Sequence, residues 1–405
     1  MVVGLFGLLG AGFLVRSFAD TPLINVEAES GTITGAASKI QPSSGASGDA
    51  AVRFGTTTST ATPTLTATTL FAGRQNIWDL AFVPNGDIVF TERNGKLSVY
   101  TGGQVKTVTT ISDVKVLGEG GLLGMTLDPD FATNRYIYTC YNSNSAKDIR
   151  LVRWTLPADY SALNGQQPIV TGITANTSGR HSGCRPRFGS DGNIWIGTGD
   201  AAVPGTLSQS KTSLNGKVLR VDRSGNGVPG NNGGGFDARV YSYGHRNVQG
   251  IAFFPSAKNG VLGISVEHGS DVDDEVNELR TGNFGWAPDP GGYNEDGVPM
   301  TDTDRFPDAI SAIWSSGDPT QAPSCAVILS GPQWKGWDGA IAMGVMKAKH
   351  LKILRLDATN KVTKEEKLYQ DTYGRIRTPV LGPDGNLYIT TDNGTDDKII
   401  KLSPQ

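Results

Sequence analysis

The chain has little of what several protein classes depend on. Cysteine occurs only three times in 405 residues, at Cys140, Cys184 and Cys325. An odd number so far apart excludes a disulfide framework and leaves room for one bridge. The formal net charge of −3 excludes a general attraction to nucleic acid or to an anionic membrane. Long helical periodicity is absent, which excludes a helical bundle.

Long hydrophobic runs are also missing. The longest, Val2 to Val15, is too short to span a bilayer comfortably. Because small residues follow it at Ser17-Phe18-Ala19, residues 1–19 are interpreted as a signal peptide. No basic residue precedes the run, so an uncleaved anchor is the alternative. Either interpretation predicts an exported protein, periplasmic or extracellular, with the membrane as a partner only through this segment.

The region from Asp20 to Thr69 differs in composition from the rest. Residues 25–55 predict a short β-rich extension, and the Thr/Ser run 56–69 predicts a linker. The opening of the extension resembles a fragment of a β-sandwich carbohydrate-binding module. A plain β-rich tail remains the alternative.

What the chain has in abundance is turn chemistry, with 53 glycines and 21 prolines. Six times an apolar stretch runs through a turn into a β-rich segment, starting near Trp78, Leu122, His181, Val248, Cys325 and Ile376. The clearest copies have Asn85-Gly86, Asp191-Gly192 and Asp384-Gly385 between two strands, which predicts two-residue hairpin turns. Strand-only repeats of this length are typical of propeller blades. The fold class is therefore all-β, with a six-bladed β-propeller over residues 70–405.

A propeller gathers polar residues from every blade around one central funnel. His181 and Asp200 flank one predicted hairpin, so they can face each other as a base and its orienting carboxylate. A purely structural His–Asp pair is the alternative. Arg246 and Asn247 precede the next blade, where they offer a guanidinium and an amide.

A glycine turn beside clustered carboxylates follows in the sequence from Glu267 to Asn277. Backbone carbonyl and carboxylate oxygens suit Ca²⁺, although the spacing does not match an EF-hand loop. A solvated acidic turn is the alternative. The later insert 283–318, rich in Gly, Pro and Asp, is expected to form an extended loop over one face.

Cations cluster in the last two predicted blades. Arg375 and Arg377 alternate around Ile376, so both face one side of a strand, and Lys347 ends a strand of the preceding blade. With Arg246, these residues predict a ligand that carries several carboxylates or phosphates. Surface salt bridges to neighbouring acids are the alternative.

The whole set resembles the soluble pyrroloquinoline quinone (PQQ)-dependent sugar dehydrogenases, the glucose/sorbosone and aldose sugar dehydrogenase family. The matching stretches fall in order over about 330 residues: 121–124 with 128–131, 181–200, 244–250, 267–277 with 283–286, 347, and 375–377 with 383–385. The resemblance implies a six-bladed propeller, in agreement with the repeats. It also implies an enzyme that oxidises the anomeric carbon of an aldose to a lactone with PQQ and Ca²⁺, and passes the electrons to an external acceptor.

The resemblance also implies a role for each matching residue. His181 matches the general base and Asp200 the acid near it, and Arg246 and Asn247 match residues that contact the cofactor, with the arginine near the quinone carbonyls. Gly269 and Ser270 match backbone ligands of Ca²⁺, in a turn that His268 and Asp274 line. The expected contacts to the cofactor carboxylates come from Thr320, Lys347, Arg375 and Arg377.

Some positions depart from the family pattern. Glu119 stands where the glucose-type enzymes carry glutamine, which puts a carboxylate near an anionic cofactor. Glu119 is therefore expected to be protonated, to turn away, or to lower cofactor affinity. Ser270 replaces a common proline, Cys184 a small residue and Thr378 an acid. Two other classes stay open: a Ca²⁺-dependent propeller hydrolase of the lactonase type, and a non-catalytic propeller that binds carbohydrate or protein.

Overall fold

The computed structural model describes residues 37–40, 51–54, 61–288 and 292–405, and divides the chain into two units, 1–60 and 61–405. In the first unit, β1 (Ala37–Ile40) pairs with β2 (Ala51–Phe54) as an antiparallel hairpin. The proposed signal peptide or anchor, residues 1–19, lies outside the described residues. Among the residues that are described, no helix has the length and hydrophobicity needed to cross a membrane.

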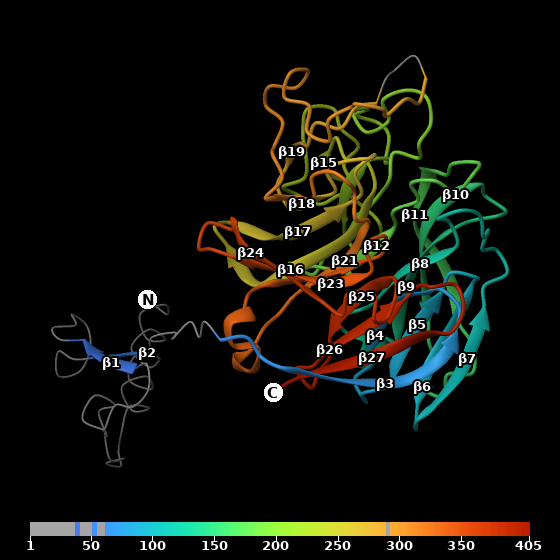
Figure 1. Cartoon of the computed structure of the whole chain (residues 1–405). Coiled ribbons are helices and arrows are strands. Elements are labelled where there is room, and N and C mark those ends of the chain that lie inside the picture. The colour runs from blue at the N-terminus through green and yellow to red at the C-terminus, as the bar shows by residue number, and fades with distance from the viewer. Residues whose placement is uncertain (1–36, 41–50, 55–60, 289–291) are drawn as a thin grey trace, which may run out of the picture. The chain divides into compact units, whose positions relative to one another are not determined.

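The second unit is a ring of six antiparallel blades, so the expected six-bladed propeller is confirmed (Figure 1). The first blade contains β4 (Ile77–Phe82), β5 (Ile88–Glu92), β6 (Lys96–Thr101) and β7 (Gln104–Thr110), and the second contains β8 (Leu122–Leu127), β9 (Tyr136–Asn142), β10 (Asp148–Thr155) and β11 (Asn164–Thr174). The third contains β12 (Arg185–Phe188), β13 (Ile194–Gly197), β14 (Lys217–Val221) and β15 (Val240–Tyr243), and β19 (Gly282–Asn283) pairs with β15 in parallel at its edge.

The other three blades follow the same plan. They contain β16 (Val248–Lys258), β17 (Val261–Glu267), β18 (Glu275–Glu278) and β20 (Trp314–Ser315); β21 (Pro323–Ile328), β22 (Ile341–Val345), β23 (His350–Leu356) and β24 (Val362–Leu368); and β25 (Ile376–Leu381), β26 (Leu387–Thr391) and β27 (Asp397–Pro404) with β3 (Leu65–Arg74). The short helices α2 (Phe131–Asn134) and η3 (Pro332–Trp337) lie in connections between strands.

The Asx-Gly repeats do mark the hairpin that joins the first two strands of a blade, but the turns are longer than two residues. Between β4 and β5 the backbone N–H of Gly86 donates to the carbonyl of Val83, and the N–H of Val83 donates to the carbonyl of Asp87, which leaves a three-residue loop, 84–86. Gly86 has a φ of 90°, and the equivalent glycines of the other two repeats also have positive φ. A glycine with positive φ at the last loop position is typical of three-residue hairpin loops.

The ring closes by pairing the two ends of the propeller unit. β3 is the outer strand of the last blade and runs antiparallel to β27, with Leu65 opposite Pro404 (Figure 1). Residues 65–69, expected as the end of a linker, therefore lie in a strand. The propeller starts at least five residues earlier than the boundary expected at Leu70.

Apolar side chains fill the space between neighbouring blades. Leu122 and Met125 of β8, for example, pack in one cluster with Val89 and Leu97 of the preceding blade. This packing follows from the strand period of two, because alternate side chains of each blade face its neighbours.

A buried arginine ties the inner strands together at the axis. Arg185 of β12 donates to the carbonyls of Trp78 and Gln249 and to the hydroxyls of Ser324 and Thr378. Thr378 stands where the family pattern has an acid, and it serves here as a neutral acceptor for this arginine. The floor of the funnel is thus held by bonds that reach from one blade into four others.

Two of the three cysteines form the single disulfide bridge that the sequence left possible. Cys140 of β9 and Cys184, just before β12, form a disulfide with a Cα–Cα distance of 5.7 Å, and Cys325 is a free, buried thiol. The bridge fastens the segment 181–184 to the neighbouring blade.

Candidate functional site

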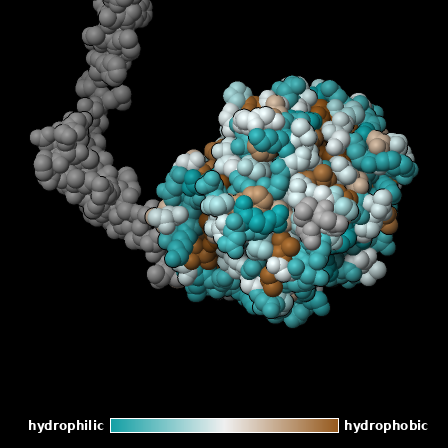
Figure 2. Space-filling model, turned by 90° about the horizontal axis from the view of Figure 1, so that it is seen from above, coloured by the Kyte–Doolittle hydropathy of each residue, from teal (hydrophilic) through white to brown (hydrophobic). Residues whose placement is uncertain are grey.

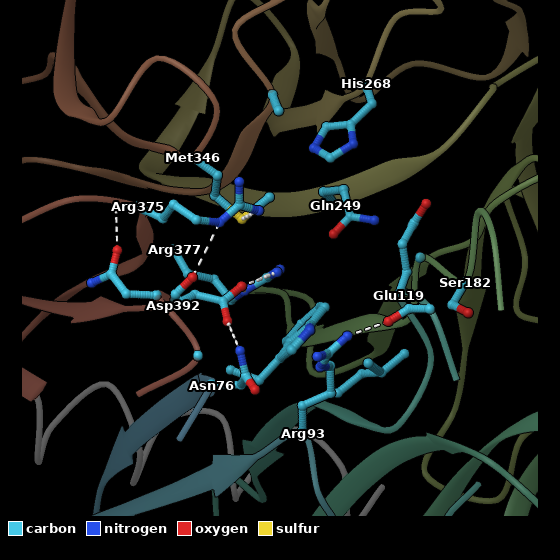
Figure 3. A pocket seen from close by; sticks show the side chains of 17 residues that line it. Asn76, Arg93, Glu119, Ser182, Gln249, His268, Met346, Arg375, Arg377 and Asp392 are labelled. Carbon is cyan, nitrogen blue, oxygen red and sulfur yellow. Dashed lines mark hydrogen bonds and ion pairs between the residues drawn. The ribbon is translucent and has the colours of Figure 1, made fainter. Parts of the chain in front are cut away.

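Two adjoining cavities lie where the loops between blades meet. The larger has a volume of about 430 Å³ and the smaller about 280 Å³. Glu119, His268 and Ala322 belong to the walls of both, so the cavities share one boundary. Figure 3 shows the larger one, with Arg375, Arg377 and Asp392 on one side and Glu119 and Ser182 on the other.

His181 and Asp200 form the expected pair. The Nδ1 atom of His181 lies 2.7 Å from Oδ1 of Asp200, and both side chains are buried. Burial acts to raise the pKa of Asp200, but the hydrogen bonds from His181 and Trp286 bring it below its usual value. An ionised Asp200 fixes the imidazole proton on Nδ1, which leaves the lone pair of Nε2 available in the smaller cavity that His181 lines.

The insert after β19 completes this pair. Trp286 Nε1 donates to Oδ2 of Asp200 at 2.8 Å, and the Tyr293 hydroxyl lies 3.1 Å from the same oxygen and 3.2 Å from Nδ1 of His181. The sequence predicted a loop over one face here, but it did not predict that Tyr293 and Trp286 would reach the His–Asp pair.

Glu119 faces the site and is bonded on both oxygens. It accepts the backbone N–H of His181 at 3.2 Å and the side-chain amide of Asn247 at 3.0 Å. Burial acts to raise the pKa of Glu119, but its interactions with His181, His268 and Asn247 lower it. The expectation that Glu119 is turned away is therefore wrong, and the lowered pKa favours its ionised form. A carboxylate stands on the wall that the two cavities share.

Arg246 is held by an acid that sequence reasoning missed. Its Nε and one terminal nitrogen donate to Oε2 of Glu295 at 3.0 and 2.8 Å, and the other donates to the carbonyl of His268 at 3.1 Å. Its backbone N–H donates to Glu267. Arg246 thus enters the smaller cavity already paired.

The two arginines of the last blade have different partners. Arg377 is nearly buried and forms an ion pair with Asp392, whose other oxygen accepts the amide of Asn76 at 2.6 Å. The Arg375 side chain donates to the carbonyl of Asp392 and to the sulfur of Met346 (Figure 3). Within the described residues, Arg375 has no carboxylate in ion-pair contact. The common face predicted for the two arginines is present, because both line the larger cavity.

Lys347 and the turn after β17 complete the arrangement. Lys347 donates to the Thr320 hydroxyl at 3.0 Å, and Thr320 lines the smaller cavity with Gly269 and Ser270. Asp274 accepts the backbone N–H groups of Gly269 and Ala322, both at 3.0 Å. Asp274 therefore shapes the turn. His268 donates from Nε2 to the carbonyl of Pro323, and burial lowers its pKa, so it is neutral.

The structure thus brings the sequence-predicted residues together from four blades and, for Glu119, from the connection between the first two blades. Residues that the sequence analysis did not single out also line the two cavities: Asn76, Trp78, Arg93, Gln249, Met346, Asp392, Arg180 and Glu295. The one available signal was the repeat itself, because Asp392 follows the second strand of its blade as Asp200 does.

A six-bladed propeller whose loops assemble a polarised histidine beside a cation-lined cavity has the features of a propeller enzyme. Comparisons with known proteins identify the class. Residues 74–401 match the model of the family described as glucose/sorbosone dehydrogenase. The chain belongs to this family, and the recognition made from the sequence is confirmed. Membership also confirms the expectation of an enzyme, an oxidoreductase of the sugar dehydrogenase class.

Individual relatives are similar in sequence to this chain over most of their length. An uncharacterized protein of Synechocystis is 31% identical over 82% of this chain and 84% of its own. The aldose sugar dehydrogenase YliI of Escherichia coli is 29% identical over 81% of this chain and 90% of its own. The PQQ-bound form of the aldose sugar dehydrogenase from Streptomyces coelicolor is 29% identical, with a TM-score of 0.69 over 85% of this chain and all of that one.

Proposed function

We propose that this protein oxidises the anomeric carbon of aldose sugars to lactones, with PQQ and Ca²⁺ as cofactors and an external electron acceptor. The observation that carries the proposal is the His181–Asp200 pair, which leaves Nε2 of His181 available in a cavity that adjoins a second, cation-lined one. Export to the periplasm or the exterior, proposed from the N-terminal segment, fits a sugar substrate and an external acceptor.

His181 would act as the general base. The anomeric hydroxyl would donate its proton to Nε2 while Asp200, ionised and held by Trp286, stabilises the positive imidazolium. PQQ held by Arg375 and its neighbours would supply a hydride acceptor, and Ca²⁺ held at Gly269 and Ser270 would supply a Lewis acid. Arg246 is placed beside His181, where its guanidinium would face developing negative charge.

The residues of the larger cavity fit a planar tricarboxylate. Trp78, whose ring Arg377 approaches to 4.9 Å, offers an aromatic surface in the wall. In that wall, Arg375 offers a cation whose side chain forms no ion pair with a described carboxylate. Lys347 offers another such cation beside Thr320 of the smaller cavity. The chemistry of these donors supports carboxylate binding. Arg377 and Arg246 would contribute as well, but from ion pairs that already exist.

The turn at Gly269 and Ser270 would supply Ca²⁺ with backbone oxygens. Gly269 is closely packed, since a Cβ atom there would lie 2.0 Å from the carbonyl oxygen of Val272. Among the described residues, no group of three or more His, Cys, Asp or Glu side chains is placed to hold a metal ion. A calcium ion here would therefore depend on carbonyl oxygens and on the cofactor.

Reconstitution tests the proposal. The purified protein is titrated with PQQ in the presence of Ca²⁺, and aldose oxidation is followed with a dye as electron acceptor. Activity should require both additions and should yield the lactone. A protein that binds PQQ but oxidises no aldose would contradict the assignment.

The two alternative functions have less support. A lactonase-type hydrolase relies on inward carboxylates and amides around a central ion, whereas cations from two blades line the larger cavity here. A non-catalytic binding propeller has no need of a buried histidine whose tautomer is fixed by an ionised aspartate. The reconstitution experiment separates both from the dehydrogenase.

A further inference from the structure

Glu295 lies between two arginines at the cavity that contains His181. Its Oε1 accepts from Arg180 at 2.7 Å, and its Oε2 accepts from Arg246 at 2.8 and 3.0 Å. The Tyr293 hydroxyl donates to Oε2 at 3.0 Å. Burial acts to raise the pKa of Glu295, but the charge of Arg246 lowers it, so this residue is a carboxylate.

This arrangement determines the charge of the cavity wall that a substrate would contact. Arg180 and Arg246 are the two arginines in the wall of the smaller cavity, and both are occupied by Glu295. The same wall contains the carboxylates of Glu119 and Asp274. A substrate carboxylate placed there would find both guanidinium groups already paired and would lie near the carboxylates of Glu295, Glu119 and Asp274, which is unfavourable.

For the hydroxyl groups of a sugar, the same wall is favourable. Carboxylate oxygens accept hydrogen bonds from hydroxyls, and guanidinium N–H groups that are not used by Glu295 can donate to them. The wall therefore suits a polyol without charge.

We propose that Glu295 is a specificity-determining residue that makes the site select uncharged aldoses against sugar acids. The proposal rests on the proposed aldose oxidation and names the substrate class of that reaction. Glu295 acts by keeping Arg180 and Arg246 paired. A uronic acid keeps the anomeric centre and carries a carboxylate in place of the hydroxymethyl group, so it is the matched probe.

The test compares glucose with glucuronate in wild type and in Glu295→Gln. Glutamine keeps the shape and leaves two guanidinium groups without a counter-charge. The ratio of kcat/KM for glucuronate to that for glucose should rise about tenfold to a hundredfold, as expected when a carboxylate gains a charge-assisted contact. Because both sugars are compared on the same preparation, differences in cofactor occupancy cancel in the ratio.

Glu366 provides the matched control. It also bridges two cations, Arg355 at 2.8 Å and Lys364 at 3.1 Å, and accepts from Trp337, but on outer strands of another blade. Glu366→Gln should leave the ratio unchanged. A ratio in Glu295→Gln within twofold of wild type, or a wild type that oxidises glucuronate as well as glucose, would overturn the proposal.

A binding measurement separates this proposal from the dehydrogenase assignment. Calorimetry of the full chain without added cofactor should show that Glu295→Gln binds glucuronate at least tenfold more tightly than wild type does. If no aldose is oxidised but this difference is found, the dehydrogenase assignment fails and the charge selection stands. Equal glucuronate affinities of the two proteins would overturn the charge selection itself.

Discussion

Arg375 and Arg377 are separated by one residue, yet their replacement should have different consequences. The side chains of Arg377 and Asp392 are only 10% and 6% exposed, and Arg377 is the arginine in ion-pair contact with that carboxylate. Removing one partner of a buried pair costs about 3–5 kcal/mol, because the other charge stays buried alone. Arg377→Ala should therefore lower the free energy of unfolding by about this amount.

Arg375→Ala should instead spare the fold and weaken the cofactor. Its protein partners are a carbonyl and a sulfur atom, so no buried carboxylate loses its counter-charge. A hydrogen bond to a charged group contributes about 1.5–3 kcal/mol, so the Kd for PQQ should rise about tenfold to a hundredfold.

Urea unfolding and a PQQ titration followed by tryptophan fluorescence measure the two effects. The double variant Arg377→Ala/Asp392→Asn is the control, because removing the orphaned charge should restore most of the lost stability. The reasoning is refuted if Arg377→Ala unfolds with the wild-type free energy, or if Arg375→Ala binds PQQ with unchanged affinity.

Three further predictions concern other charged groups. His181→Gln should lower kcat by about 10²–10⁴ while PQQ still binds, and near-normal turnover would sink the assignment of the base. Glu119→Gln should tighten PQQ, because a carboxylate leaves the shared wall, and an unchanged Kd would contradict this. Burial and the charge of Glu267 raise the pKa of Glu275 from 4.5 to about 8. The folded state then holds an extra proton, so unfolding free energy should fall by up to about 1.4 kcal/mol per pH unit between pH 4.5 and 8. Glu275→Gln should remove that slope, and equal slopes in urea unfolding would refute it.

The sequence allowed the blades and the His–Asp pair to be predicted for local reasons. Each Asx-Gly turn specifies a hairpin within about twenty residues, and His181 and Asp200 flank one such hairpin. Pairing of the two strands brings the ends of the hairpin together, so the residues that flank it lie close to each other. The predicted length of the turn was wrong, because the glycine with positive φ ends a three-residue loop and not a two-residue one.

The partners of the arginines could not be predicted in the same way. Glu295 reaches Arg246 across 49 residues and Arg180 across 115, from a loop without regular structure. Nothing in strand period or turn chemistry fixes where such a loop returns. The sequence therefore indicated several cations without showing which of them the protein already neutralises.

That difference bears on how an anionic cofactor would be bound. Four unpaired cations in one funnel would repel one another and destabilise the fold before any ligand arrived. The chain instead pairs the two most buried candidates, Arg246 with Glu295 and Arg377 with Asp392. Lys347, which is exposed, and Arg375 have no such pair among the described residues. No described carboxylate neutralises these two cations, so of the four predicted ones they are those whose charge a cofactor carboxylate can use most fully.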